Sequence, residues 1–473
     1  MALFDLKKLC VSRIKHLGNK GISTMKKNVQ LFAKSTLTLS ILVFTSLAHA
    51  NVSLEQQVAQ LQQQVQALQE LVQQQQKAND QKFNEQKMAA APALVESAAP
   101  KKSSAPVLQH TTKGGAEFEL YGNVRADMSY QMKGPNTMYN LISAVPLEGT
   151  PDEHKNSDKF QSTLNATRFG FNFKTPQLGE HAIGGKVEMD FFGGAGRDTF
   201  RIRHAYMTYD QWLLGQTWSN FNAVEYFPET VDASLSVGGS LTRVPQIKYS
   251  VPVNPHLNLA FSLEDSKAET VTRTGTQNFT TDPDAKLKLP SATGRVNYKF
   301  DNGSALSGRA FVTQKATNHE GNDDFLAWGV ALGGKYQAAE NTLVRFDYNH
   351  IKGDTKNLLW SNMAYVFDDN NKMRANQFDA ISVGLTQKIT SKIRSTLGFG
   401  YMKADDNNSF AQLVRNGNDE TQNSELKEGW INLFYNPVKP VNFGLEYMYG
   451  ERKTFNDKKG IDNRLNFTAI YDF

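Results

Sequence analysis

Short segments in which apolar and polar residues alternate fill the chain from residue 117 to its end. The last nine residues, LNFTAIYDF (465–473), show the pattern clearly: every second position is apolar or aromatic, and the intervening positions are mostly polar. Such alternation predicts β-strands with one apolar face. We count about sixteen such segments, at residues 118–130, 161–174, 181–192, 199–209, 211–219, 244–251, 257–264, 289–300, 304–314, 325–336, 342–351, 377–388, 392–402, 428–436, 441–450 and 464–473.

The connections between these segments alternate in length. Short turns are expected at 175–180, 210–211, 252–256, 301–303, 338–341, 390–391 and 437–440. Longer polar segments occupy 131–160, 220–243, 265–288, 352–376, 403–427 and 451–463, and 193–198 and 315–324 are intermediate. Tight periplasmic turns and longer outer loops are typical of outer-membrane barrels, whose even strand number places both ends in the periplasm.

The apolar phase of the strands is aromatic and continuous, as in Phe169, Phe171 and Phe173, while the opposite phase is polar or glycine. A closed sheet with lipid outside and water inside explains this division. A soluble β-sandwich usually has shorter strands, and a propeller requires a repeat of about forty residues that the chain lacks. We therefore predict an all-β fold: a transmembrane antiparallel β-barrel of about sixteen strands at 116–473, preceded by a short coiled-coil helix.

The first fifty residues read as an upstream extension followed by a secretory signal peptide. From Met25, which we consider as the true start, three lysines precede an apolar run at 37–47 and an A-x-A cleavage site at 48–50. The run is too short for a membrane-spanning helix, although a membrane-anchoring first helix is the alternative.

Residues 51–76 carry a heptad repeat, with Val58, Val65 and Val72 seven residues apart and leucines between them. This pattern predicts a short coiled coil, which would lie in the periplasm; a disordered Gln-rich spacer is the alternative. Residues 77–115 are rich in Ala, Pro, Ser and Lys, which predicts a flexible linker.

Charge and cysteine content exclude several functional classes of protein. Residues 1–50 contribute eight of the 52 Lys and Arg residues and one of the 47 acidic residues, so the remaining chain has a formal net charge of −2 and gives no sign of nucleic-acid binding. The single cysteine, Cys10, lies before the cleavage site, so the mature chain has neither a disulfide nor a cysteine nucleophile.

The inward phase of the predicted strands is rich in basic residues. They are Arg125, Arg168, Lys186, Arg201, Arg203, Lys248, Arg295, Arg309 and Arg345. The inward acids are fewer: Asp127, Glu188, Asp190, Glu264, Asp347 and Glu446. A basic wall in a narrow lumen concentrates anions, and the planar fork of arginine binds carboxylates. The alternative is solvated, paired charges without selectivity, such as Arg345 with Asp347.

Residues 219–243 form a long loop that is unusually apolar for an outer loop. We expect it to fold into the barrel and narrow it, with Glu225, Glu229 and Asp232 facing the basic wall. An ordinary outer loop, or one that packs on a neighbouring subunit, remains open.

Other motifs carry no chemistry that we can defend. The stretch GVALGGKY (329–336) resembles a phosphate-binding loop but has Tyr336 where Ser or Thr is needed, and it lies in a strand pattern. His204 falls on the outward phase, and the nine histidines show no metal-binding spacing. We expect no catalytic residues, no metal and no cofactor.

Four motifs together resemble the DcaP-like outer-membrane porins. They are LYGNVR (120–125), RIRHAY (201–206), LGQTWS (214–219) and FPETVD (227–232), and the resemblance covers the whole mature chain. It implies a homotrimer for passive diffusion of small anionic solutes such as dicarboxylates, and of anionic β-lactamase inhibitors. Terminal Tyr471 and Phe473 look like the aromatic end-signal read by the barrel-assembly machinery. Alternatives are a sugar-specific or general porin, a non-conducting envelope anchor or adhesin, and a barrel lipase.

Overall fold

The structure is a computed structural model that describes residues 108–112, 115–175, 181–193, 199–265, 269–270, 280–281, 285–286, 288–318 and 323–473. The expected signal peptide, coiled coil and most of the expected linker lie outside these residues. Leu108–Thr111, which composition assigns to the linker, instead form strand β1 and pair with β2. Among the described residues, no helix is both long and apolar enough to cross a bilayer.

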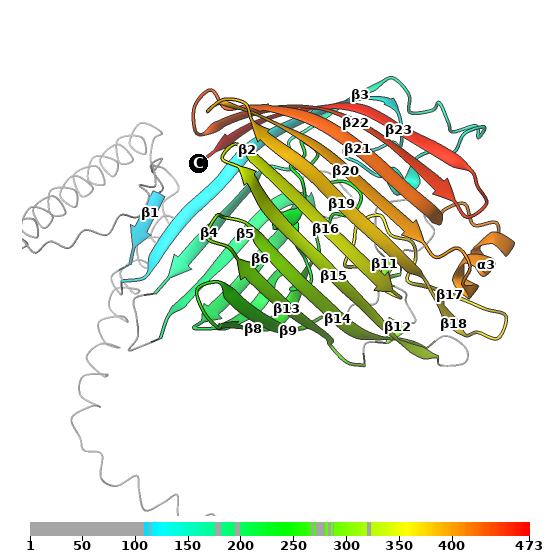
Figure 1. Ribbon diagram of the computed structural model, residues 1–473, viewed down its shortest axis with the longest axis horizontal. Helices are drawn as coiled ribbons and strands as arrows, with labels where there is room; N and C mark the ends of the chain where they lie inside the picture. The colour runs from blue at the N-terminus through cyan, green and yellow to red at the C-terminus, as the bar shows by residue number, and fades with distance from the viewer. Residues whose placement is uncertain are drawn as a thin grey trace, which may run out of the picture. The chain divides into compact units, whose positions relative to one another are not determined.

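Sixteen antiparallel strands close into a barrel, as the sequence pattern predicts (Figure 1). They are β2 (Glu117–Lys133), β4 (Arg168–Lys174), β5 (Ile183–Gly193), β6 (Thr199–Tyr209), β7 (Trp212–Trp218), β8 (Arg243–Pro252), β9 (Leu257–Glu264), β13 (Ser291–Lys299), β14 (Ala305–Thr317), β15 (Asp324–Ala339), β16 (Thr342–Lys352), β19 (Gln377–Lys388), β20 (Ile393–Ala404), β21 (Asn423–Tyr435), β22 (Val441–Thr454) and β23 (Lys459–Asp472). Each strand pairs with its neighbours along the chain, and β23 pairs with β2. The ring therefore has no free edge, which membrane strands require.

The two-residue alternation separates the inside of the barrel from its outside. On β22, Phe443, Leu445, Tyr447 and Tyr449 are between 38% and 52% exposed, whereas Glu446 and the other residues between them are buried. The exposed large apolar side chains of the other strands follow the same phase. An apolar outer surface with a polar interior is the pattern of a membrane barrel.

The C-terminal strand completes the ring. The backbone N–H of Phe473 donates to the carbonyl of Gly122 at 2.9 Å, and the N–H of Gly122 donates back at 3.1 Å. On β23, Tyr471 is exposed on the outer surface, whereas Asn466 and Thr468 are buried inside the barrel. The apolar ending of the chain is thus the outer face of the closing strand.

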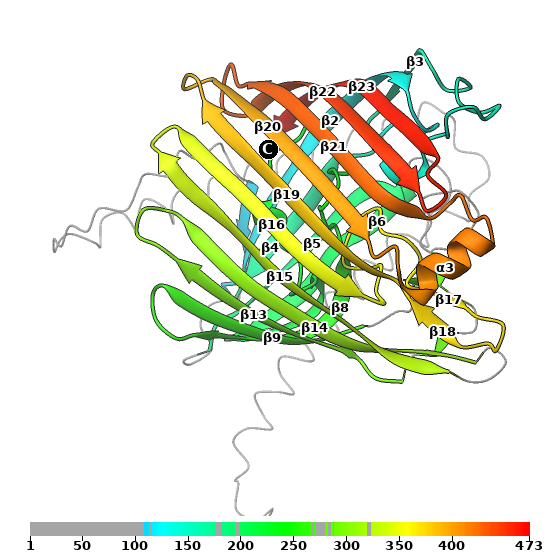
Figure 2. The ribbon, with the colours of Figure 1, turned by 45° about the vertical axis from the view of Figure 1, so that its right-hand side comes forward.

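Short turns and long loops lie at opposite ends of the barrel (Figure 2). The short turns among the described residues span 210–211, 253–256, 300–304, 340–341, 389–392 and 436–440. The prediction of a long loop at 451–463 is wrong. Strands β22 and β23 extend beyond the predicted strands and leave only a turn at 455–458. The predicted strand 161–174 is interrupted, so that β3 (Lys159–Thr163) and β4 are separate.

Several long loops carry small elements of their own that the period-two pattern did not predict. These are η1 (Ile142–Ala144), η2 (Val224–Tyr226), β10 (Glu269–Thr270), β11 (Thr280–Thr281), β12 (Ala285–Lys286), β17 (Tyr365–Phe367), β18 (Met373–Ala375) and α3 (Ser409–Asn416). Helix α3 begins after Asn408, whose side chain accepts a hydrogen bond from the Ala411 N–H.

An apolar core lies where four loops meet the inner wall. Ile142, Phe221, Trp360 and Phe410 come from four different loops and are buried together with wall residues such as Ile351. The interior of a sixteen-stranded barrel is too wide for its own side chains to fill. The loops therefore supply an internal core that the strands alone cannot form.

Inward glycines allow the loop 219–242 to lie flat on the barrel wall. A Cβ atom added at Gly400 would come within 2.2 Å of the Val237 carbonyl oxygen, and one added at Gly384 within 2.5 Å of Pro228 Cβ. The opposite surfaces of these strands carry large apolar side chains. The small inward residues thus make room for a second layer of backbone inside the barrel.

We predict that Gly400→Ala loosens this loop. The added methyl group would overlap the backbone of Val237, and overpacking of this kind typically costs about 1–3 kcal/mol. The expected results are a lower midpoint of thermal unfolding and faster proteolytic cleavage within 219–242 in detergent-solubilised protein. Gly308→Ala is the matched control, since nothing lies within 4 Å of a Cβ atom added there; equal behaviour of the two variants would contradict the prediction.

Candidate functional site

Five of the nine predicted basic residues form ion pairs inside the barrel. Arg203, for example, contacts Glu188 at 2.6 Å and Asp190 at 2.8 Å. The other four pairs are Arg125–Asp127, Arg201–Asp190, Arg295–Glu225 and Arg309–Asp347. The suggested local pair of Arg345 with Asp347 is wrong. Asp347, on β16, instead contacts Arg309 on β14, which lies two strands away.

The other four predicted basic residues have no carboxylate partner within the described part of the chain. Lys186 lies 4.6 Å from the ring centroid of Tyr121, and Arg345 donates to the Thr386 hydroxyl at 3.2 Å. The side chains of Arg168 and Lys248 have no hydrogen-bond partner in that part of the chain, and the Nε atom of Arg168 is buried. These side chains therefore bring positive charge into the lumen that no bound acid neutralises.

Four inward arginines were missed by the sequence analysis. Arg243 lies 4.6 Å from the ring of Trp218, and Arg394 binds Glu229. Arg452 donates to the carbonyl of Ser143, and Arg464 pairs with Asp462 at 2.8 Å. Arg464 could have been found from the sequence, because it shares the inward phase of Asn466 and Thr468 on the last strand. Arg243 and Arg452 lay just outside the predicted strand boundaries.

The loop 219–242 crosses the interior and binds the wall through its acids. Glu229 accepts hydrogen bonds from Nε and Nη2 of Arg394 at 2.9 Å and 2.7 Å, and Glu225 pairs with Arg295. Asp232 lies 3.9 Å from Arg464. Two of the three acids thus bind arginines other than those predicted for the basic wall.

Asp232 is nearly fully buried at the junction of two loops. Its carboxylate accepts hydrogen bonds from the backbone N–H groups of Asn140 and Ser234 at 2.9 Å and 2.8 Å. Burial raises the pKa of the Asp232 carboxyl to about 7, although Arg464 opposes this shift. This carboxyl therefore holds the loops together rather than facing the lumen as a free charge.

Three wall acids without an ion-pair partner among the described residues lie under the loops. Glu264 accepts hydrogen bonds from the Ser219 hydroxyl and the Asn220 N–H, both at 2.7 Å. Glu446 accepts from Thr230 and from the Val231 N–H at 2.9 Å, and Glu428 accepts from Asn140 at 2.6 Å. All three are at most 2% exposed. Neutral donors of the loops thus cover the acids that no cation neutralises.

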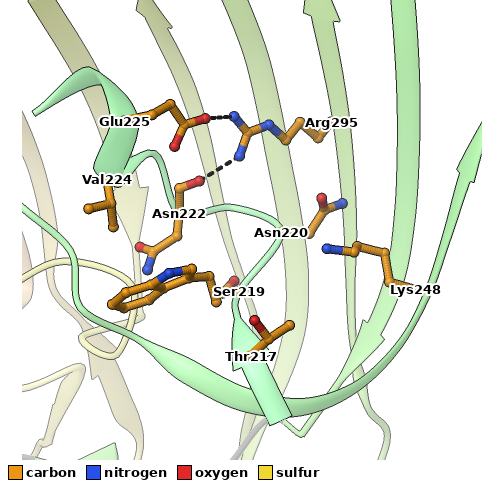
Figure 3. A pocket seen from close by; sticks show the side chains of 9 residues that line it. Thr217, Ser219, Asn220, Asn222, Val224, Glu225, Lys248 and Arg295 are labelled. Atoms are coloured by element: carbon orange, nitrogen blue, oxygen red, sulfur yellow. Dashed lines mark hydrogen bonds and ion pairs between the residues drawn. The ribbon is translucent and has the colours of Figure 1, made fainter. Parts of the chain in front are cut away.

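A cavity of about 460 Å³ lies between the start of this loop and the neighbouring wall. Its lining includes Ser219, Asn220, Glu225, Lys248 and Arg295. Figure 3 shows Arg295 and Lys248 on the wall, with Asn220 between them in this view, and Glu225 reaching Arg295 from the loop. Two cationic side chains and several amide and hydroxyl groups therefore line one cavity.

The prediction that His204 faces outward is wrong. The β5–β6 register shifts at this point, so that Glu188 pairs with His204 and Met189 with Ile202. The extra residue, Arg203, forms a bulge, and Arg203 and His204 both point inward, where His204 Nδ1 lies 2.9 Å from the Thr217 hydroxyl. Within the described ranges, no group of three His, Cys, Asp or Glu residues is arranged to hold a metal ion.

Comparisons with known proteins bear on the whole barrel. The family model for the DcaP outer membrane protein matches residues 39–473. No match was found among curated proteins.

Two solved structures resemble the chain. The outer membrane channel DcaP of Acinetobacter baumannii shares 35% sequence identity with a TM-score of 0.69, and the match covers 77% of this chain and 99% of that one. The anion-selective porin of Comamonas acidovorans shares 11% identity with a TM-score of 0.52 over 76% of this chain and all of that one, which is a likeness of fold alone. The chain therefore belongs to the DcaP outer membrane protein family and is an outer-membrane channel with the porin fold.

Proposed function

We propose that this channel allows small anionic solutes, dicarboxylates among them, to diffuse passively across the outer membrane. We further propose that it works as a homotrimer, as the resemblance to DcaP-like porins implies, and that Tyr471 and Phe473 direct its insertion by the barrel-assembly machinery. The observation that carries the proposal is a difference in exposure inside the described part of the barrel: unpaired basic side chains are partly exposed, whereas unpaired acidic side chains are buried.

Among the described residues, basic side chains without an acidic partner remain partly accessible in the lumen, whereas acidic side chains without a basic partner are covered. Arg168, Lys186, Lys248 and Arg345 are only partly buried and have no carboxylate partner in the described structure. In contrast, the acids without a cation are covered by the loops and bound by neutral donors. A mobile ion in the lumen therefore meets an excess of positive charge, although the chain after residue 50 has a formal net charge near zero.

The cavity beside the loop favours carboxylates over halide ions. Arg295 presents the Nη2 group of its guanidinium, which can donate a charge-assisted hydrogen bond to a carboxylate, and Lys248 supplies a second positive charge. A solute with two carboxylate groups can use both side chains at once. This arrangement supports dicarboxylates as the preferred class of solute.

We predict that the purified channel is anion-selective. In planar bilayers separating unequal concentrations of potassium chloride, the reversal potential should have the sign given by chloride as the more permeant ion. The preference should weaken at high ionic strength, because salt screens the lumen charges. A reversal potential of the opposite sign would contradict the proposal, and an absence of conductance would favour the anchor hypothesis.

A second prediction concerns the accessible cations. The double variant Arg168→Gln with Lys248→Gln should lower the anion-to-cation permeability ratio by about twofold or more, because each lost charge contributes on the order of 1 kcal/mol at short range even in water. Succinate uptake into proteoliposomes should fall in parallel.

The matched control for the double variant is Lys392→Gln with Lys439→Gln. Both lysines are exposed on short turns at the end of the barrel opposite the long loops. This control removes two positive charges, as the first double variant does. The control should keep the wild-type permeability ratio. If both double variants lower the ratio equally, net charge rather than the lumen wall determines selectivity.

A further inference from the structure

The three acids of the loop 219–242 are held in different ways. Glu229 is bound by the guanidinium of Arg394, and its backbone carbonyl accepts hydrogen bonds from Trp430 at 3.0 Å and Asn432 at 2.8 Å. Asp232 is 4% exposed. Glu225 differs from both, because its side chain is 49% exposed and lines the cavity.

The partner of Glu225 is held in place by other groups. Nε of Arg295 donates to Asn297 at 2.7 Å, and Nη1 donates to the backbone carbonyl of Asn222 at 2.6 Å. Both acceptors are neutral, and the Arg295 side chain is only 12% exposed. The orientation of this guanidinium therefore does not depend on Glu225, which binds the remaining Nη2 edge from the cavity side (Figure 3).

We propose that Glu225 is a displaceable internal counter-ion that sets how long a permeating carboxylate stays on Arg295 and Lys248. The inference rests on the anion-channel function proposed above. In the empty channel Glu225 occupies the free edge of Arg295. An entering carboxylate displaces Glu225 from that edge and binds Arg295 and Lys248. The Glu225 carboxylate then competes with the solute for Arg295, which promotes release of the solute.

The strength of the contact suits such an exchange. Ion pairs with one half-exposed partner are weak and exchange readily, because water competes for both groups. A channel needs binding that is strong enough to admit a solute and weak enough to release it. An arginine that neutral acceptors hold in place and that a half-exposed acid also binds meets both requirements, since the competing acid weakens solute binding without moving the arginine.

The experiment compares wild-type protein with Glu225→Gln in single-channel recordings with succinate as the probe. Succinate should interrupt the current of the wild-type channel briefly. In the variant the interruptions should last about three to five times longer, because the lost competition corresponds to a surface ion pair. The difference should shrink at high salt, which screens the pair in the wild type.

Three further variants separate the possible causes. Glu340→Gln makes the same change in net charge on the exposed short turn between β15 and β16. This variant should keep wild-type interruption times. Glu225→Asp retains the acid and should stay close to the wild type, whereas Arg295→Gln should shorten the interruptions. An open-channel current in each variant shows that it has folded and inserted.

The outcomes distinguish this inference from the proposed function. If the wild-type channel is anion-selective but Glu225→Gln leaves interruption times unchanged or shortens them, the counter-ion role is wrong and the proposed function stands. If the wild-type channel prefers cations, the proposed function fails and the inference fails with it. Longer interruptions in Glu225→Gln alone, with Glu340→Gln unchanged, support the counter-ion role.

Discussion

Every backbone N–H and C=O group within the hydrocarbon of a membrane must find a partner inside the protein, and the rest of this structure follows from that constraint. Sixteen strands meet it by pairing in a ring that β23 closes on β2. Closure forces side chains to alternate between lipid and lumen, because successive residues of a strand point to opposite faces. The aromatic outer surface and the charged inner surface are therefore two consequences of one pattern of hydrogen bonds.

A ring of this size solves the problem of the strand edges but creates an interior that its own side chains cannot fill. The loops fill part of it, with an apolar core built around Ile142, Phe221 and Trp360. Inward glycines such as Gly400 let the loop 219–242 approach the wall at backbone distance. Glycine in these strands thus serves close packing inside the barrel, while the large residues on the other face serve the lipid.

The features set by the period-two pattern could be predicted from the sequence, and those set by tertiary contacts could not. Sixteen strands and their facing follow from local alternation, which needs no knowledge of partners. His204 was placed on the wrong face because a single bulge residue, Arg203, reverses the phase. The pairs of Glu229 with Arg394 and of Asp232 with Arg464 join residues 165 or more positions apart in the chain, so no local pattern reports them.

The loops inside the barrel determine which charges of the wall are exposed to the lumen. Glu264, Glu428 and Glu446 lie on inward positions like the arginines, but backbone N–H, hydroxyl and amide groups of the loops bind and cover them. An acid that neutral loop donors bind and cover cannot be contacted by a solute in the lumen. Arg168 and Lys248 are only partly buried and have no carboxylate partner among the described residues, which is why we propose that a wall with both signs of charge acts on solutes as a basic one. In the proposed function, selectivity is therefore a property of the loops and the wall together.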